Sequence, residues 1–308
     1  MRDTKVLVTG ATGYMADRLL PALRGCQVRL VDARPVPPGG DATQQIEVAD
    51  LTQEDRSGFA SLFHGVDVVV HLAYRRSAPQ GVYDGSVPQI ERFEDEFANL
   101  RMAQNVYRCA FDAGVQRVVV ASSNHAADWY EHAQIHAGLR EMVDPYELPL
   151  SDNFYGWSKA AYEHLGFLYA SGTFGRQLEV VQLRIGAPRD LDAATYAVDE
   201  PPAPTPGPSF PTGLARYKRD LGAWLSERDG QQLLRRAIDA EGITGVHGVP
   251  WLVVYGISAN TRAFWSLASA RTVLDYHPED DSEVAYADDI RRMLTGPDAR
   301  IAGGRVGG

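Results

Sequence analysis

Residues 5–16 read Lys5-Val6-Leu7-Val8-Thr9-Gly10-Ala11-Thr12-Gly13-Tyr14-Met15-Ala16, an apolar run followed at once by two glycines and a helical pattern. Gly10 allows a tight turn, Gly13 lets the backbone approach a pyrophosphate, and Ala16 is small enough for a helix to pack on the strand. Glycines also precede helices for purely conformational reasons. Between a strand and a helix, however, the pattern favours a dinucleotide-binding loop. We assign to this loop Gly10, Gly13, Tyr14 and Met15.

The rest of the chain continues the alternation of apolar runs and helical patterns. We expect strands at 5–9, 28–31, 45–48, 66–71, 117–121, 178–185 and 251–255, and helices at 14–24, 89–113, 154–171 and 221–240. This alternation predicts an α/β protein of the Rossmann type, with a doubly wound parallel sheet. We divide it into a dinucleotide-binding domain over 1–186, a second region over 187–300 with a proline-rich loop at 197–213, and a flexible tail at 301–308.

Composition excludes several classes of protein. The 308 residues include 30 Lys and Arg against 40 Asp and Glu, a net charge of −10 that argues against nucleic-acid binding. No apolar run approaches the roughly 18 to 20 residues of a membrane span, and the first residues lack a signal-peptide pattern. Two cysteines, Cys26 and Cys109, cannot build a disulfide framework. We therefore expect a cytoplasmic protein whose partner is a small molecule.

Asp32 ends the second expected strand, at the distance from the glycine loop where an acidic residue meets the adenosine ribose. A carboxylate there accepts hydrogen bonds from both ribose hydroxyls and repels a 2′-phosphate, which favours NAD over NADP. Arg34, two residues later, is an indication against this preference for NAD. The alternative for Asp32 is a solvated residue at a strand end. The ends of the third and fourth strands would border the adenine and the phosphates. They contribute Asp50, Leu51, Leu72 and Ala73.

Tyr155 and Lys159 stand four residues apart, so both side chains lie on one face of the helix expected at 154–171. A phenol is a poor base at neutral pH, and a neighbouring ammonium group stabilises the phenolate and lowers its pKa. Ser123 follows the strand at 117–121, at the sheet edge where α/β proteins bind ligands. We predict a proton relay in which the serine polarises the reacting oxygen. The alternative is a surface helix with a stray aromatic residue.

These motifs, in this order, resemble the extended short-chain dehydrogenase/reductase superfamily, the NAD-dependent epimerase/dehydratase family, over nearly the whole chain. The resemblance implies that Ser123 orients the substrate oxygen, that Tyr155 is the general acid/base and that Lys159 also holds the nicotinamide ribose. It further implies that Asn99 supports the lysine and that Ile185 borders the cofactor. By the same resemblance, 1–186 is the NAD-binding domain and 187–300 is mainly a substrate-binding region. Members often form homodimers through the two helices that correspond to 89–113 and 154–171.

Within the superfamily, four segments are similar to uronate dehydrogenase: 121–125 (Ala-Ser-Ser-Asn-His), 183–186, 219–226 and 254–260. That family uses NAD to oxidise the anomeric carbon of a free uronic acid to an aldarolactone. The resemblance implies that Asn124 and His125 contact sugar hydroxyls and that Arg219 binds the substrate carboxylate, as a planar guanidinium can. Two departures suggest a different substrate, since Ala187 and Arg76 replace two substrate-contacting serines and Arg76 therefore lies in the pocket.

Alternatives remain open at this point. The chain could be a sugar epimerase or dehydratase that recycles bound NAD, possibly acting on a nucleotide sugar, or a dinucleotide-sensing protein without catalysis. For Arg219 the alternative is a surface helix charge, and for His125 a structural hydrogen bond. The remaining histidines show no spacing typical of metal ligands, so we predict no metal site. They are His64, His71, His132, His136, His164, His247 and His277.

Overall fold

The computed structural model describes residues 4–35, 45–76, 89–196, 207 and 211–295, and its centre is a sheet of seven parallel strands. The strands lie in the order β3-β2-β1-β4-β5-β6-β7, and every adjacent pair is parallel. Their bounds are β1 Lys5–Thr9, β2 Gln27–Asp32, β3 Ile46–Val48, β4 Val68–His71, β5 Arg117–Ser123, β6 Glu179–Ile185 and β7 Trp251–Gly256. The order reverses direction at β1, as in a doubly wound fold, so the predicted fold class is confirmed.

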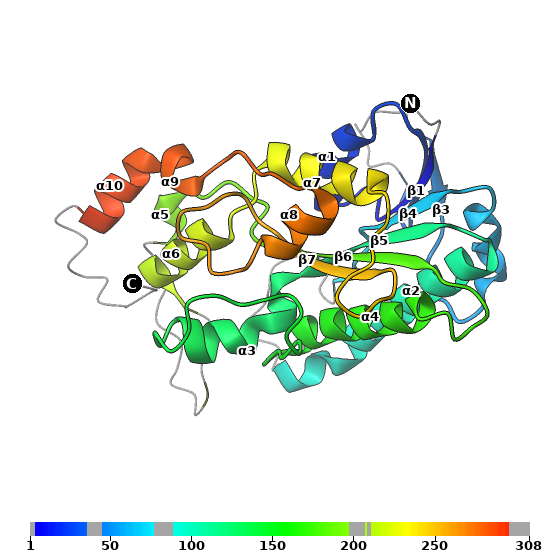
Figure 1. Ribbon diagram of the computed structural model, residues 1–308, viewed down its shortest axis with the longest axis horizontal. Helices are drawn as coiled ribbons and strands as arrows, with labels where there is room; N and C mark the ends of the chain where they lie inside the picture. Colours follow the sequence, from blue (N-terminus) through cyan, green and yellow to red (C-terminus); the bar gives the residue numbers. More distant parts are fainter. Residues whose placement is uncertain (1–3, 36–44, 77–88, 197–206, 208–210, 296–308) are drawn as a thin grey trace.

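Helices cover both faces of the sheet (Figure 1). On one face lie α2 (Phe93–Asp112) and α4 (Phe154–Ala170); on the other lie α1 (Tyr14–Leu19), α7 (Glu227–Asp239) and α8 (Ala268–Leu274). Neighbouring residues of β1 point to opposite faces, so Val6 packs in the cluster with Leu233 of α7 and Leu7 in the cluster with Met102 of α2. Burial on both faces explains why the strands read as continuous apolar runs.

Shorter helices complete the chain. They are α3 (Asp128–Tyr130), α5 (Ala193–Tyr196), α6 (Gly213–Ala223), α9 (Ser282–Ala285) and α10 (Ala287–Thr295), with 3₁₀ turns η1 (Leu20–Leu23), η2 (Arg56–Gly58), η3 (Ala60–Phe63), η4 (Gln89–Arg92) and η5 (Asn124–Ala127), and a π-helical turn η6 (Glu131–Ile135). A separate small cluster of apolar residues joins α5 to α6 and includes Leu191, Tyr217 and Trp224. Figure 1 shows α5, α6, α9 and α10 together at one end of the molecule, beyond the sheet.

The prediction of a single helix at 221–240 is wrong, because the helical backbone is interrupted between α6 and α7. Around Trp224 the backbone is extended, and Leu225 donates to the carbonyl of Ala187 (3.0 Å). The side chain of Asn260 donates to the Trp224 carbonyl (2.7 Å), and Ser226 caps α7 through the amide of Asp229 (3.1 Å). Contacts distant in sequence thus end one helix, and a serine cap begins the next.

Other expected elements agree with the structure within a few residues. The first helix ends at Leu19 and continues as η1, because Pro21 has no amide hydrogen for an α-helical bond. The proline-rich loop at 197–213 falls largely outside the described residues, and the tail at 301–308 lies wholly outside them. The division at residue 186 stays a prediction. Across the described ranges, no helix has both the length and the apolar character needed to cross a bilayer.

Candidate active site

The loops after β1 and β4 meet at the carboxyl edge of the sheet. Gly10 has φ of +73°, and a Cβ there would lie 2.6 Å from the backbone of Ala73. Leu72 donates to the carbonyl of Thr9 (3.1 Å), which holds the two loops together. Gly13 begins α1, and the Tyr14 hydroxyl donates to the Pro188 carbonyl (2.5 Å). Only glycine fits at residue 10, and the turn leaves backbone rather than side chains facing a ligand.

Asp32 lies at the end of β2, beside the glycine loop. Its side chain is buried and accepts hydrogen bonds from the amides of Thr12 and Arg34 (3.0 Å each). The Arg34 guanidinium donates to Thr12 Oγ1 (3.0 Å) and lies 3.5 Å from an Asp32 oxygen. The strand end, the glycine turn and this acceptor form the donor and acceptor set that a dinucleotide requires, so the residues fit NAD. Arg34 thus contacts both Thr12 and Asp32 and belongs to the same group of polar residues beside the glycine loop.

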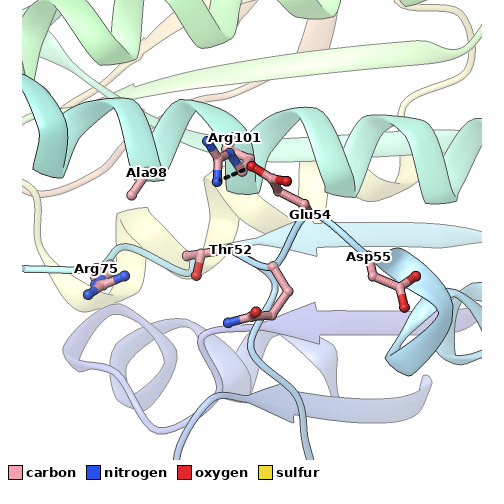
Figure 2. A pocket seen from close by; sticks show the side chains of 7 residues that line it. Thr52, Glu54, Asp55, Arg75, Ala98 and Arg101 are labelled. Atoms are coloured by element: carbon pink, nitrogen blue, oxygen red, sulfur yellow. Dashed lines mark ion pairs between the residues drawn. The ribbon is translucent and has the colours of Figure 1, made fainter.

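A hollow of about 450 Å³ adjoins the predicted adenine end of this site (Figure 2). It lies between α2, which carries Ala98 and Arg101, and the segment after β3. Its lining is Thr52, Gln53, Glu54, Asp55, Arg75, Ala98 and Arg101. Asp50 turns back on its own loop, because its oxygens accept from Thr52 (2.9 and 2.7 Å) and Gln53 (2.8 Å). Leu51 is buried beneath it.

Asn99 fixes the segment that follows β4. Its oxygen accepts from the Arg75 amide (2.8 Å), and its nitrogen donates to the Arg75 carbonyl (2.9 Å). The Asn99 nitrogen also lies 3.4 Å from the carboxylate of Glu96, and the expected support of Asn99 for the lysine stays a prediction. Glu96 is a buried residue that the sequence analysis did not single out. Its position three residues before Asn99 on one helix face is the signal that was available.

Lys159 is buried on α4, and its Nζ donates to the Ala121 carbonyl of β5 (3.0 Å). Burial lowers the pKa of Lys159 to about 8, against the opposing charges of Glu96 and Glu163. The Glu96 carboxylate in turn accepts from the hydroxyl groups of Tyr74 and Ser158. Burial raises the pKa of the Glu96 carboxyl, and these hydrogen bonds lower it in part. Lys159 therefore lies beside a buried polar network, and its lowered pKa brings its loss of a proton closer to neutral pH.

The start of α4 places Tyr155 beside β5. Asn153 caps the helix by accepting from the amide of Gly156 (2.9 Å). A Cβ at Gly156 would lie 2.0 Å from the carbonyl oxygen of His125, so the helix packs directly on the segment after Ser123. The rings of Tyr74 and His125 meet the Tyr155 ring edge-on, at centroid distances of 5.3 and 5.5 Å. The structure thus brings the predicted serine, tyrosine and lysine together.

The expectation that the ammonium group lowers the phenol pKa is wrong in this structure. Burial of the hydroxyl raises the pKa of Tyr155 to about 12, although the hydrogen bond with Ser123 and the charge of Arg76 act in the opposite direction. Lys159 Nζ lies 5.7 Å from the tyrosine ring centroid and is already bonded to a carbonyl. A positive charge nearer the phenol is needed to favour the phenolate. When bound, NAD⁺ brings a cationic ring that accepts hydride and acts in this direction.

The residues after Ser123 form the expected sugar side of the site. His125 Nδ1 bonds both oxygens of Asp128 (2.8 and 2.9 Å), so its ring is oriented by a buried carboxylate. Asn124 is buried. When its amide nitrogen is oriented to donate to the Ile185 carbonyl (2.9 Å), its amide oxygen accepts from Arg219 Nη2 (2.5 Å). Ile185 pairs with Ser123 across the sheet, and Arg76 is exposed after β4. Both readings of His125 remain compatible with this geometry.

Arg219 is 2% exposed, so the alternative of a surface helix charge is wrong. Its Nε and Nη2 atoms bond the two oxygens of Glu131 (2.7 and 3.0 Å), and Nη1 bonds Asp220 (2.9 Å). Its role as a binder of substrate carboxylate stays a prediction, because the structure shows the guanidinium bonded to carboxylates of this chain. Glu131 was not predicted as a site residue, although Asp128 and Glu131 are spaced one helical turn apart just after the site serine.

Three of the buried side chains near this site have the types and spacing of metal ligands. Ligand atoms of Asp128, Glu131 and His132 lie within 4.8 Å of one another. Each residue already has a protein partner: His125 for Asp128, Arg219 for Glu131, and Asp152 for His132 (2.6 Å). These bonds account for the cluster as a hydrogen-bonded network, and we propose no metal there.

Comparison with known proteins places this geometry in a family. Residues 6–185 match the model of the NAD dependent epimerase/dehydratase family. The chain belongs to that family. It is 31% identical to an NAD-dependent glucose-6-phosphate dehydrogenase of Haloferax volcanii over 91% of this chain and 95% of the relative. It is also 31% identical to an L-arabinose 1-dehydrogenase (NAD(P)(+)) of the same organism, over 90% and 97%.

The crystal structure of uronate dehydrogenase from Agrobacterium tumefaciens superposes with a TM-score of 0.67 at 26% identity, covering 96% of this chain and 91% of that one. The family and these relatives confirm the resemblance, the NAD cofactor and the assignment as an oxidoreductase. The names of the three relatives differ in their substrates: a phosphorylated sugar, a neutral pentose and a sugar acid.

Proposed function

We propose that this enzyme oxidises the hemiacetal carbon of a small sugar or sugar acid and reduces NAD. The observation that carries the proposal is the meeting of Ser123, at the end of β5, with Tyr155 in the first turn of α4. Lys159 follows one turn later and lies at the same strand end. The named relatives support a sugar substrate, since each is a dehydrogenase of a sugar or sugar acid.

In the proposed reaction, the Ser123 hydroxyl donates a hydrogen bond to the reacting hydroxyl, and the Tyr155 phenolate takes that hydroxyl's proton. NAD⁺, when bound, would supply the acceptor for the hydride of the sugar C–H bond, and the sugar carbon would gain a C=O bond. Lys159 would hold the nicotinamide ribose. The sugar thus loses two electrons and two hydrogens, one as hydride and one as a proton.

The test is formation of NADH from NAD, followed at 340 nm, over a panel of free aldoses, uronic acids and nucleotide sugars. We expect net NADH with at least one free sugar or sugar acid, and loss of nearly all turnover in Tyr155→Phe with NAD binding retained. Tyr169→Phe is the matched control, because Tyr169 lies at the other end of α4 and its hydroxyl bonds Gln104.

Other outcomes would replace the proposal. Isomer formation without net NADH would indicate an epimerase that recycles its cofactor. NAD binding without any turnover across the panel would indicate a dinucleotide sensor. Undiminished rates in Tyr155→Phe would remove this phenol from the mechanism.

We also propose a homodimer in the cytoplasm. Phe93, Phe97 and Trp157 form a cluster of ring contacts on α2 and α4, and each is more than a third exposed. An apolar face of this kind supports association of two copies. Cys26 and Cys109 are both unpaired, as in a reducing compartment. Sedimentation equilibrium should give twice the chain mass, and Phe97→Glu should give the monomer; a wild-type monomer would contradict the dimer.

A further inference from the structure

The guanidinium of Arg219 is already bonded to groups of its own chain. Glu131 accepts from Nε and Nη2, and Asp220 accepts from Nη1. With the Asn124 amide nitrogen donating to the Ile185 carbonyl, the Asn124 oxygen also accepts from Nη2. Each of the three guanidinium nitrogens, Nε, Nη1 and Nη2, thus has a carboxylate acceptor within this chain. The bidentate bond with Glu131 has the planar fork geometry with which arginine binds a carboxylate ligand.

This ion pair lies at the sugar side of the site. Asn124 directly follows Ser123 and joins the strand end to Arg219. Asp128, one turn before Glu131, bonds His125 and also accepts from Asn153 (2.7 Å). A second buried carboxylate therefore stands between the arginine pair and the ring that faces Tyr155.

Glu131 is completely buried, as is Asp220, so neither can turn into solvent when a charged ligand arrives. A substrate carboxylate would have to displace Glu131 from Arg219, which leaves a buried carboxylate without its partner, or lie beside it and repel it. The free energy of either arrangement is unfavourable, whereas a hydroxymethyl group or a hydrogen at the same ring position requires neither.

Resting on the function proposed above, we propose that Glu131 takes the place of a substrate carboxylate on Arg219 and makes this enzyme specific for neutral aldoses over uronic acids. Glu131 is thus a specificity-determining residue that acts through Arg219. It supplies a repulsive element against the charged sugar, which is how related sites separate similar ligands.

The experiment compares sugars that differ only at C6: D-galactose with D-galacturonate, and D-glucose with D-glucuronate. For the wild-type enzyme we expect kcat/KM to favour the neutral member of each pair by at least about tenfold. Glu131→Gln keeps the shape but removes the charge and should narrow that ratio by about tenfold, mainly through a lower KM for the uronate. Glu131→Asp keeps the charge and should keep the preference.

Glu179→Gln is the matched control, since Glu179 bonds the buried Arg117 at the opposite, amino edge of the sheet (2.6 Å). It should leave the substrate ratio unchanged. The wild-type ratio is informative even if a Glu131 variant fails to fold. A wild-type preference for the uronate overturns this inference and leaves the proposed function standing, as does an unchanged ratio in folded Glu131→Gln. Absence of NADH with every sugar overturns the proposed function itself.

Discussion

Replacing Lys159 by methionine separates what the lysine does for catalysis from what it does to stability. Lys159 is 4% exposed, and its Nζ donates to the Ala121 carbonyl on β5. Methionine has a similar unbranched shape and no charge, so it fills the same space without the desolvated ammonium. We expect Lys159→Met to lose nearly all turnover, because the proposed contact of Lys159 with the nicotinamide ribose is lost.

The stability effect follows from the pKa. Burial lowers the pKa of Lys159 from 10.5 to about 8. At about 1.36 kcal/mol per pKa unit, holding this lysine protonated costs the folded state roughly 3 kcal/mol. The unfolded chain binds the proton more tightly, so the cost is complete below about pH 8 and disappears as the pH rises from 8 to 10.5. The charge of the wild-type lysine thus opposes folding at neutral pH.

The assay is urea unfolding of both proteins at matched pH values from 7 to 10. The free energy of unfolding of the wild type should rise relative to that of Lys159→Met by about 2 to 3 kcal/mol over this range. The lost bond to Ala121 adds a constant that does not change with pH, so the slope is the decisive quantity. A difference that is flat with pH, or that falls as the pH rises, would refute the assignment of a desolvated lysine.

Three further predictions concern the framework of the site. Glu163→Ala leaves the buried Arg184 without its bidentate partner (2.9 and 2.7 Å) and should lower the free energy of urea unfolding by roughly 3 to 5 kcal/mol. The double variant Glu163→Leu with Arg184→Met should partly restore that free energy. An unchanged urea midpoint in Glu163→Ala would contradict this prediction. Asp32→Ser removes the acceptor at the end of β2 and should raise the kcat/KM ratio of NADP to NAD at least about tenfold, so an unaltered ratio counts against Asp32 as the ribose ligand. Gly156→Ala forces the first turn of α4 away from His125 and should cost about a hundredfold in kcat, whereas near-normal activity would mean that this contact does not position Tyr155.

Local sequence was sufficient for the elements whose signals are local. The glycine turn at Gly10, the valine-rich strands and the spacing of Tyr155 and Lys159 predicted the sheet and the meeting of the site residues, because parallel strands end at one edge. The break before Ser226 could not be predicted with the same ease, since Asn260 and Ala187 stabilise the extended backbone there from distant segments. Its serine cap was the one local signal.

The pairing of buried charged residues was the other feature that could not be predicted from the sequence. Glu131 and Arg219 are 88 residues apart in sequence, and nothing near either residue shows that they pair. The resemblance to uronate dehydrogenase gave Arg219 a substrate partner, whereas the structure shows a carboxylate of the same chain in that place. The expected lowering of the Tyr155 pKa was wrong for a related reason. Burial of the phenol raises this pKa, and the Lys159 ammonium group already donates to the Ala121 carbonyl. Desolvation depends on the packed environment and not on spacing.

Transfer of the hydrogen from C1 of the sugar to NAD is the most direct test of the central claim. The sugar that the wild-type enzyme oxidises would be prepared with deuterium at C1 and turned over to completion, and the isolated NADH would be weighed by mass spectrometry. One deuterium per NADH is the expected result, together with a deuterium-free lactone or acid. NADH without deuterium, or deuterium retained on the sugar, would contradict oxidation of the hemiacetal carbon at this site.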